Sequence, residues 1–149
     1  MGPPSLRSWR QCATTNGTEL SFYLDTSALV KLVVSEPQSD ALQIWLTDEA
    51  RQAVACDLVR TELARAVRRA APEHVLRART VLDAVTLLQV TPAVFDAAAR
   101  LDPVGLRTLD AVHLASALDL GDELEGLVTY DERLAEAARS NGVPVFAPG

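Results

Sequence analysis

The chain has 149 residues, of which 48% are hydrophobic, so it is long and apolar enough to fold as one domain without disulfides. Its formal net charge of −6 argues against a broad cationic surface for nucleic acid, but not against an enzyme that holds phosphates through a metal ion. The two cysteines form no ligand pattern, no apolar run is long enough to span a membrane, and no secretory signal is evident, so we expect a cytoplasmic protein.

Residues 1–20 are rich in Gly, Pro, Ser, Thr and Asn and have neither a helical nor a strand period. We therefore expect a poorly ordered extension at 1–20, followed by a single domain at 21–149. The first elements expected in that domain are, in order, a strand at 21–24, helices at 28–34 and 39–46, a strand at 52–56, and helices at 58–71 and 72–84. Ser39 and Asp57 stand where two of these helices begin, and each is expected to be the N-cap. Cys56 lies in an apolar run and is expected in the core.

The second half of the domain continues the alternation. The elements expected there are a buried strand at 85–90, helices at 92–101 and 109–118, a strand at 126–129, a helix at 131–140 and a strand at 143–146. Thr91, followed by Pro92, is expected to cap the first of these helices, and Thr108 the second. Apolar strands that alternate with helices predict an α/β fold, a single domain with a mostly parallel central sheet flanked by helices.

Four acidic residues stand at positions that favour a site. Asp25 follows the first strand and Asp131 follows the strand at 126–129, and the carboxyl ends of parallel strands are where α/β folds bind ligands. Glu62 and Asp110 lie on helices among apolar neighbours, where a carboxylate is costly unless it is paired or bound to a metal ion. If the four converge, two of them about 4 Å apart repel by roughly 4 kcal/mol at an effective dielectric near 20.

A divalent cation would remove this repulsion. Mg²⁺ or Mn²⁺ suits an all-oxygen site that has few protein ligands and several waters, and such a site activates water for attack on a phosphodiester. The sequence has no cluster of His and Cys, so a zinc site is not expected.

Four strings in this chain, taken in order, resemble those of PIN domains of the VapC toxin type. They are YLDTSALVK at 23–31, TELARA at 61–66, LDAVHLASA at 109–117 and LVTYDERL at 127–134. The resemblance runs from about residue 21 to the C-terminus and leaves out the extension at 1–20. Each string alone is a weak signal, but four in order with suitable spacing are specific.

The resemblance implies an endoribonuclease that inhibits translation and growth as the toxin of a bacterial toxin–antitoxin pair. It implies an RNA substrate, a homodimer, and a cognate antitoxin protein that blocks the active site. It also implies that one or two Mg²⁺ or Mn²⁺ ions are bound by an acidic quartet of catalytic residues. The members of this quartet would be Asp25, Glu62, Asp110 and Asp131.

Two hydroxyl residues match further positions of the family. Ser27 stands two places after the first acid and Thr129 two places before the last, and both are expected to orient carboxylates as hydrogen-bond donors. One departure is Asp57, where many relatives have serine.

Each of these residues also has a simpler interpretation. Asp25 could only end a strand, and Asp131 could be a plain N-cap, although a cap and a metal ligand can be the same residue. Glu62 could pair with Arg65 or Arg69 on its own helix, three and seven places further on.

The basic residues and the histidine near the acids stay open in the same way. Arg65, Arg69 and Arg107 are possible RNA-binding residues, or parts of solvated helix faces. His113 follows Asp110 by three places, and we favour a packed, hydrogen-bonded histidine over a general base.

Two other functions compete with the nuclease. A PIN-like domain with weak or no catalysis could serve as a binding module. A phosphatase with an aspartyl nucleophile is disfavoured because such sites usually have a second acid two places after the first, where this chain has Ser27. For the nuclease, hydrolysis by metal-activated water predicts products with 5′-phosphate and 3′-hydroxyl ends.

Overall fold

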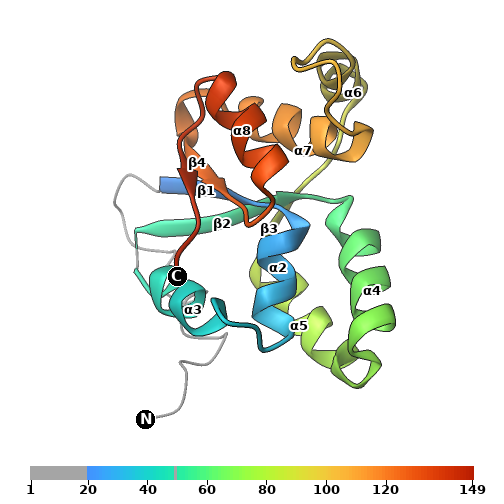
Figure 1. Ribbon diagram of the computed structural model, residues 1–149, viewed down its shortest axis with the longest axis vertical. Helices are drawn as coiled ribbons and strands as arrows, with labels where there is room; N and C mark the ends of the chain where they lie inside the picture. The colour runs from blue at the N-terminus through green and yellow to red at the C-terminus, as the bar shows by residue number, and fades with distance from the viewer. Residues whose placement is uncertain (1–19, 49) are drawn as a thin grey trace.

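One parallel sheet organises the computed structural model, which describes residues 20–48 and 50–149. Its five strands have the order β3-β2-β1-β4-β5, and every neighbouring pair is parallel (Figure 1). The strands are β1 (Leu20–Leu24), β2 (Arg51–Cys56), β3 (Thr86–Leu88), β4 (Leu124–Val128) and β5 (Val145–Phe146). The expected α/β fold with a parallel central sheet is confirmed.

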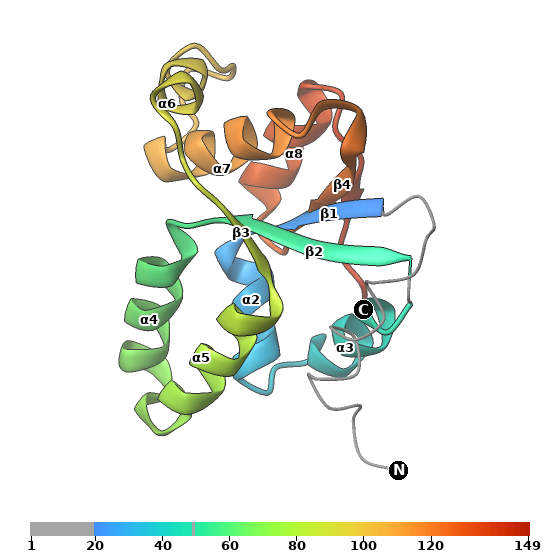
Figure 2. The same cartoon turned by 180° about the vertical axis from the view of Figure 1, so that it is seen from behind.

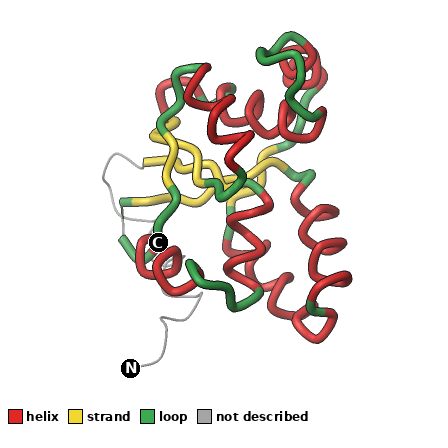
Figure 3. Tube along the Cα trace, in the orientation of Figure 1, coloured by secondary structure: helices red, strands yellow, loops and turns green. Residues whose placement is uncertain are grey.

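Helices cover both faces of this sheet. They are α2 (Thr26–Val33), α3 (Ser39–Leu46), α4 (Val59–Ala70), α5 (Val75–Ala84), α6 (Pro92–Ala99), α7 (Thr108–Leu118) and α8 (Glu132–Ser140), with short 3₁₀ turns at Pro72–His74 and Gly121–Glu123. Helices α2 to α5 lie on one side of the strands, and α7 and α8 on the other, with α6 packed outside α7 (Figures 1 and 2). The layering of helix, strand and helix is also visible in the trace of Figure 3.

The central strand β1 contributes side chains to both layers. Phe22 and Leu24 belong to the buried cluster under α2, α4 and α5, whereas Tyr23, between them, belongs to the cluster under α7 and α8. This alternation follows from the two-residue period of a strand. All three side chains are buried because helices cover both faces, as parallel sheets require.

The order of the strands reverses at β1. From β1 the chain moves outward through β2 to β3, and then returns to the other side of β1 to form β4 and β5. The carboxyl ends of β1 and β4 therefore lie next to each other at a topological switch point, where α/β folds form their ligand sites.

Three expected N-caps were wrong, and for two of them the side chain bonds to a different backbone group. Ser39 is the first residue of α3 and not its N-cap; its hydroxyl accepts from the Glu36 backbone N–H and donates to the Val34 carbonyl. The Asp57 carboxylate does not cap α4 but accepts from the Val90 backbone N–H at 3.3 Å.

The third concerns α7, which has no side-chain N-cap: Thr108 is its first residue. The cap expected at Thr91 is confirmed, since its hydroxyl accepts from the Val94 backbone N–H.

The strand expected at 85–90 is shorter and less buried than the sequence indicated. β3 covers Thr86–Leu88 at the edge of the sheet, where Thr86 is exposed and the two leucines are only partly buried. At the N-terminal end, β1 begins at Leu20, one residue before the expected strand. The rest of the predicted extension, 1–19, lies outside the described residues. Within 20–48 and 50–149, no helix is both long and apolar enough to cross a membrane.

Candidate active site

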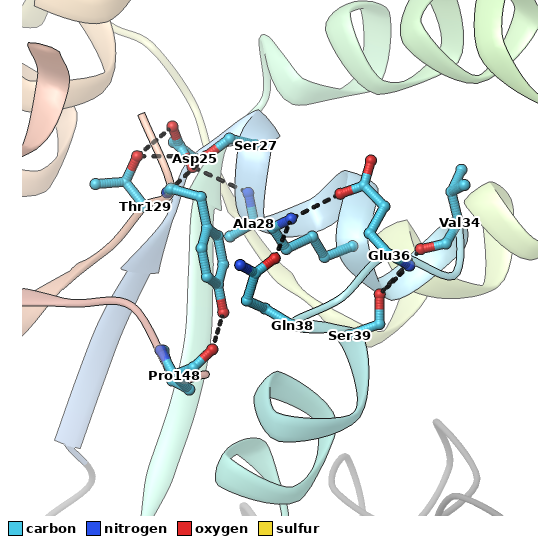
Figure 4. A network of polar contacts seen from close by, with 11 residues as sticks. Asp25, Ser27, Ala28, Val34, Glu36, Gln38, Ser39, Thr129 and Pro148 are labelled. Carbon is cyan, nitrogen blue, oxygen red and sulfur yellow. Dashed lines mark hydrogen bonds and ion pairs between the residues drawn. The ribbon is translucent and has the colours of Figure 1, made fainter. Parts of the chain in front are cut away.

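Asp25 occupies the junction between β1 and α2, where a dense set of hydrogen bonds fixes its carboxylate. It is the N-cap of α2, with Oδ1 accepting from the Ala28 backbone N–H at 3.1 Å. The Ser27 hydroxyl donates to the same oxygen at 2.7 Å, and the Thr129 hydroxyl donates to Oδ2 at 2.8 Å (Figure 4). Asp25 is thus held by one hydroxyl from the first turn of α2 and by one from the residue that follows β4.

Burial dominates the electrostatics of this carboxylate. Asp25 is 5% exposed, and desolvation raises its pKa above the usual range of aspartate. The hydrogen bonds from Ser27, Thr129 and Ala28 stabilise the charged form and oppose the rise without cancelling it. The ionised Asp25 carboxylate therefore favours a cation beside it.

The junction of β4 and α8 places the second strand-end acid. Thr129, which is 1% exposed, also accepts from the Asp131 backbone N–H at 3.1 Å. Asp131 is the N-cap of α8: its Oδ1 accepts from the backbone N–H groups of Arg133 and Leu134 at 2.9 and 3.3 Å. The predicted cap is therefore present, and Oδ2 has no hydrogen bond from the residues that the structure describes.

Tyr130, between Thr129 and Asp131, contacts both α2 and the C-terminal residues. Its backbone N–H donates to the Ser27 hydroxyl at 3.0 Å, and its phenol donates to the Pro148 carbonyl at 2.7 Å. The Lys31 ammonium lies 4.7 Å from the centre of the Tyr130 ring and is itself bound by Glu36 at 2.7 Å. These contacts join the start of α8 to α2 and to the C-terminal residues (Figure 4).

Glu62, on α4, is held from across the sheet by His113 on α7. The distance from His113 Nε2 to Glu62 Oε1 is 2.6 Å, and an ionised carboxylate can only accept, so Nε2 must carry a proton. On the other side of the ring, Tyr23 Oη lies 2.8 Å from Nδ1, and Tyr23 Oη accepts from the Cys56 backbone N–H at 3.0 Å. The helix-local pairing of Glu62 with an arginine is wrong, because no arginine contacts it within the described residues.

His113 is the packed, hydrogen-bonded histidine that the sequence favoured. Burial by itself would lower its pKa, but the contacts with Cys56 and Glu62 outweigh that effect and raise the pKa to about 10. Burial would raise the pKa of the Cys56 thiol, yet His113, whose Nδ1 is 3.7 Å from Sγ, lowers it. Cys56 is fully buried, as expected. Sequence reasoning missed its contact with the histidine because nothing in the spacing of residues 56 and 113 indicates it.

Asp110 lies in the first turn of α7 and is half-buried. Its pKa is raised first by desolvation and then by the negative charges of Asp131 and Glu62, while His113 and Arg107 oppose the rise. The negative charges of Asp110, Asp131 and Glu62 are therefore close enough to repel one another. A divalent cation would offset both the cost of burying the charged carboxylate and the repulsion between the acids.

A family model of the PIN domain matches residues 22–140. The chain belongs to the PIN-domain family. Its sheet, with acids at the carboxyl ends of β1 and β4, is thus the sheet of a PIN domain.

Several curated relatives of this PIN domain carry the name of one enzyme type. "Ribonuclease VapC46" of Mycobacterium tuberculosis is 44% identical over 128 residues, 86% of this chain and 98% of the relative. "Ribonuclease VapC47" of the same species is 43% identical over 131 residues, covering 85% and 96%. Among solved structures, the VapC20 toxin of M. tuberculosis, which cleaves the sarcin–ricin loop, superposes with a TM-score of 0.68 over 85% of this chain and 99% of its own. At 16% identity, that likeness shows the fold alone.

The donor set of this PIN domain fits Mg²⁺ or Mn²⁺. The predicted ligands supply only carboxylate oxygen, and burial raises the pKa of both Asp25 and Asp110, which nearby acids raise further only for Asp110. Within 20–48 and 50–149, no three His, Cys, Asp or Glu side chains come together closely enough to form a metal-binding group. A cation that keeps several waters, and binds through one or two carboxylates, is compatible with this spacing.

The arginines expected near RNA lie on two separate surfaces. Arg65 and Arg69 are exposed on α4 and line a shallow depression together with Arg68. Arg107 precedes α7 and borders a different pocket that also includes Asp110. None of these arginines forms an ion pair with Glu62, so their guanidinium groups are available to other anions.

Proposed function

We propose that this chain is a Mg²⁺- or Mn²⁺-dependent endoribonuclease, the toxin of a toxin–antitoxin pair that inhibits translation and growth by cutting RNA. The observation that carries the proposal is the fixed carboxylate of Asp25 at the switch point, with Asp131 and Asp110 near enough for their charges to interact. Relatives 43–44% identical to the chain and named as VapC ribonucleases support it. We assign the activity to residues 21–149, the predicted nuclease domain.

The chain's own residues prepare the metal ligands. Ser27 and Thr129 fix both oxygens of Asp25, so this carboxylate needs little reorganisation to bind a cation. His113 holds Glu62 in the same way through Nε2. When bound, the metal ion supplies Lewis-acid chemistry: it lowers the pKa of water and neutralises charge that develops on the phosphodiester.

His113 itself is not the general base in this proposal. Its side chain is 2% exposed and both ring nitrogens have partners, so it cannot reach a proton on water or on a ribose hydroxyl. Attack by water leaves a 5′-phosphate and a 3′-hydroxyl. A 2′,3′-cyclic phosphate would contradict this mechanism while leaving the nuclease assignment intact.

The toxin assignment brings two protein partners. One is a cognate antitoxin that covers the acidic site, and the other is a second copy of the chain in a homodimer. Co-expression with a cognate antitoxin should suppress RNA cleavage. Light scattering of the purified complex and of the free chain should give the mass of each assembly.

The deciding experiment is the cleavage of total RNA by purified chain free of antitoxin. We expect cleavage with Mg²⁺ or Mn²⁺, none with EDTA, and none with Asp110→Asn in a protein that circular dichroism shows to be folded. Asp83→Asn is the matched control, because Asp83 is an exposed aspartate near the end of α5, ahead of the amino end of β3 and not at the carboxyl end of a strand. Full cleavage by both Asp25→Asn and Asp110→Asn would refute the proposal.

The competing functions give different results in the same preparation. A binding module would neither cleave RNA nor bind Mg²⁺ or Mn²⁺ in a calorimetric titration. A phosphatase with an aspartyl nucleophile would form an acid-labile phosphate on Asp25. That reaction is disfavoured because both oxygens of this carboxylate already accept hydrogen bonds from Ser27 and Thr129.

A further inference from the structure

A pocket of about 300 Å³ lies beside the acidic site, between the start of α7 and the exposed face of α8. Asp110 is one of its lining residues, so the pocket and the predicted catalytic site share this side chain. Its charged lining comes from Arg107, Asp110, Arg133 and Glu136, and Gly105 forms part of its wall. The sequence pointed to Arg107 but gave no reason to single out Arg133.

Neither arginine of this pocket forms an ion pair within the described residues, although the charge of Arg107 acts on Asp110. The ion pairs found there involve Lys31, Arg51 and the two histidines. Arg133 also has Glu136 one turn further along α8, yet the two form no ion pair. An unpaired guanidinium has a rigid fork of donors that matches a phosphate group.

The balance of charge in the pocket favours an anion once the catalytic site is assembled. With Asp110 committed to a metal ion, two arginines face the one remaining carboxylate of Glu136. The start of α7 also favours an anion, because this helix has no side-chain cap and its first backbone N–H groups therefore lack a side-chain acceptor.

We propose that this pocket binds the phosphate of the nucleotide next to the cleaved bond, with Arg133 and Arg107 as its donors. This inference rests on the proposed ribonuclease function and names the surface along which the RNA strand leaves the catalytic site. A strand whose scissile phosphate lies at Asp110 must carry a neighbouring phosphate past the residues that border Asp110. On this side of the site those residues are the two arginines.

The first test measures RNA binding without cleavage. Binding of a fluorescein-labelled single-stranded RNA of mixed sequence to full-length Asp25→Asn protein is followed by anisotropy over a range of NaCl concentrations. Loss of one phosphate contact lowers the salt slope for single strands by about 0.7, which corresponds to roughly a fivefold loss of affinity at 0.1 M salt. We expect this change for Arg133→Ala in that background.

Arg139→Ala is the matched control. Arg139 is an exposed arginine on the same helix, α8, and does not line the pocket. Its removal changes the net charge by the same amount, so a general electrostatic effect would appear in both variants. We expect the salt slope of Arg139→Ala to stay within error of the parent protein.

A second pair of variants uses Gly105 to change the charge of the pocket without removing an existing side chain. A Cβ at Gly105 would meet nothing within 4 Å, and its φ lies outside the left-handed region, so substitution is tolerated. Gly105→Glu should weaken RNA binding and Gly105→Lys should strengthen it, each by a fewfold. Opposite effects of two long side chains at one position cannot arise from a loss of folding.

The outcomes separate this inference from the function on which it rests. If wild-type protein cleaves total RNA while Arg133→Ala and Arg139→Ala bind RNA equally, the pocket is not a phosphate site and the ribonuclease stands. If Gly105→Glu and Gly105→Lys shift affinity in the same direction, the electrostatic argument is also overturned. If wild-type protein does not cleave RNA and Asp25→Asn does not bind it, the ribonuclease proposal fails, and the phosphate site fails with it.

Discussion

Replacing Thr129 with valine tests whether hydrogen bonding holds the acidic site together. Valine has nearly the same shape as threonine, so the packing is retained while the hydroxyl is lost. That hydroxyl donates to Asp25 Oδ2 at 2.8 Å and accepts from the Asp131 backbone N–H at 3.1 Å, and the residue is 1% exposed. The substitution therefore removes one hydrogen bond to a carboxylate and one to a backbone amide, together with a longer contact of 3.3 Å to the Ser27 hydroxyl.

The expected cost follows from these two bonds. A hydrogen bond to a charged group contributes about 1.5–3 kcal/mol and one to a neutral group about 1 kcal/mol, so Thr129→Val should lower the free energy of unfolding by about 2.5–4 kcal/mol. For a chain of this size each kcal/mol corresponds to about 3 °C in Tm, which predicts a fall of roughly 7–12 °C. Urea denaturation followed by circular dichroism measures the difference, with an unchanged m-value as the check on two-state unfolding.

The pH dependence of this cost has a definite sign. Burial raises the pKa of Asp25 in the folded chain, and the Thr129 bond favours the ionised carboxylate. The bond therefore contributes most above the folded pKa of Asp25, where the carboxylate is charged. As the pH falls through that pKa the carboxyl becomes neutral, and the stability difference between Thr129→Val and wild type should shrink.

Thr26→Val is the control for the chemistry of the substitution. The Thr26 hydroxyl is buried without a hydrogen-bond partner among the described residues, so its removal should be neutral or stabilising. If Thr26→Val and Thr129→Val destabilise the protein equally, or if Thr129→Val lies within about 0.5 kcal/mol of wild type, the hydroxyl does not hold the site together.

The remaining predictions concern other contacts. His113→Leu removes the Nε2–H that holds Glu62, so the affinity for Mn²⁺, measured by calorimetry, should fall about tenfold. His113→Gln keeps a hydrogen-bond donor and should recover part of this affinity. Equal affinities in the two variants would contradict the positioning role of His113. Gly126→Ala places a Cβ 2.4 Å from the ring of Phe146, which is closer than van der Waals contact. The substitution should therefore lower the free energy of unfolding in urea by about 1–3 kcal/mol. Wild-type stability would show that the Phe146 ring moves aside without cost. Leu63→Ala deletes a fully buried side chain of α4 and should cost about 2–5 kcal/mol by the same measurement; a cost below 1 kcal/mol would mean that α4 is not packed as described.

Local patterns were sufficient to predict the architecture of this chain. Alternation of apolar strands with amphipathic helices predicted the parallel sheet, because strand and helix periods depend only on nearby residues. The same holds for Thr91 and Asp131 as N-caps, whose backbone partners are two or three residues away. The four acids were singled out in the same local way, because strand ends and apolar helices are recognisable from nearby residues, and their grouping into one site stays a prediction. Their role as a set of metal ligands stays a prediction as well.

Tertiary structure decided which partner each polar side chain has. Glu62 is bound by His113, 51 residues away, and not by the arginines one or two turns along its own helix. Asp57, after β2, accepts from the Val90 backbone N–H, which follows the neighbouring strand β3, and α4 has no side-chain cap. These contacts depend on how helices pack against the sheet, and the spacing along one element carries no information about that packing.

The edge position of β3 and the pocket at Arg133 depend on strand order and helix packing in the same way. A run of apolar residues indicates a strand, but only its place in the sheet determines whether one face stays exposed, as at Thr86. Arg133 follows Asp131 by two residues and resembles any exposed arginine in the sequence. It becomes a candidate for phosphate binding only because α7 and α8 pack with Asp110 and Arg107 beside it. The sequence thus determines the elements and their acids, whereas the packing of distant elements determines which of these groups meet.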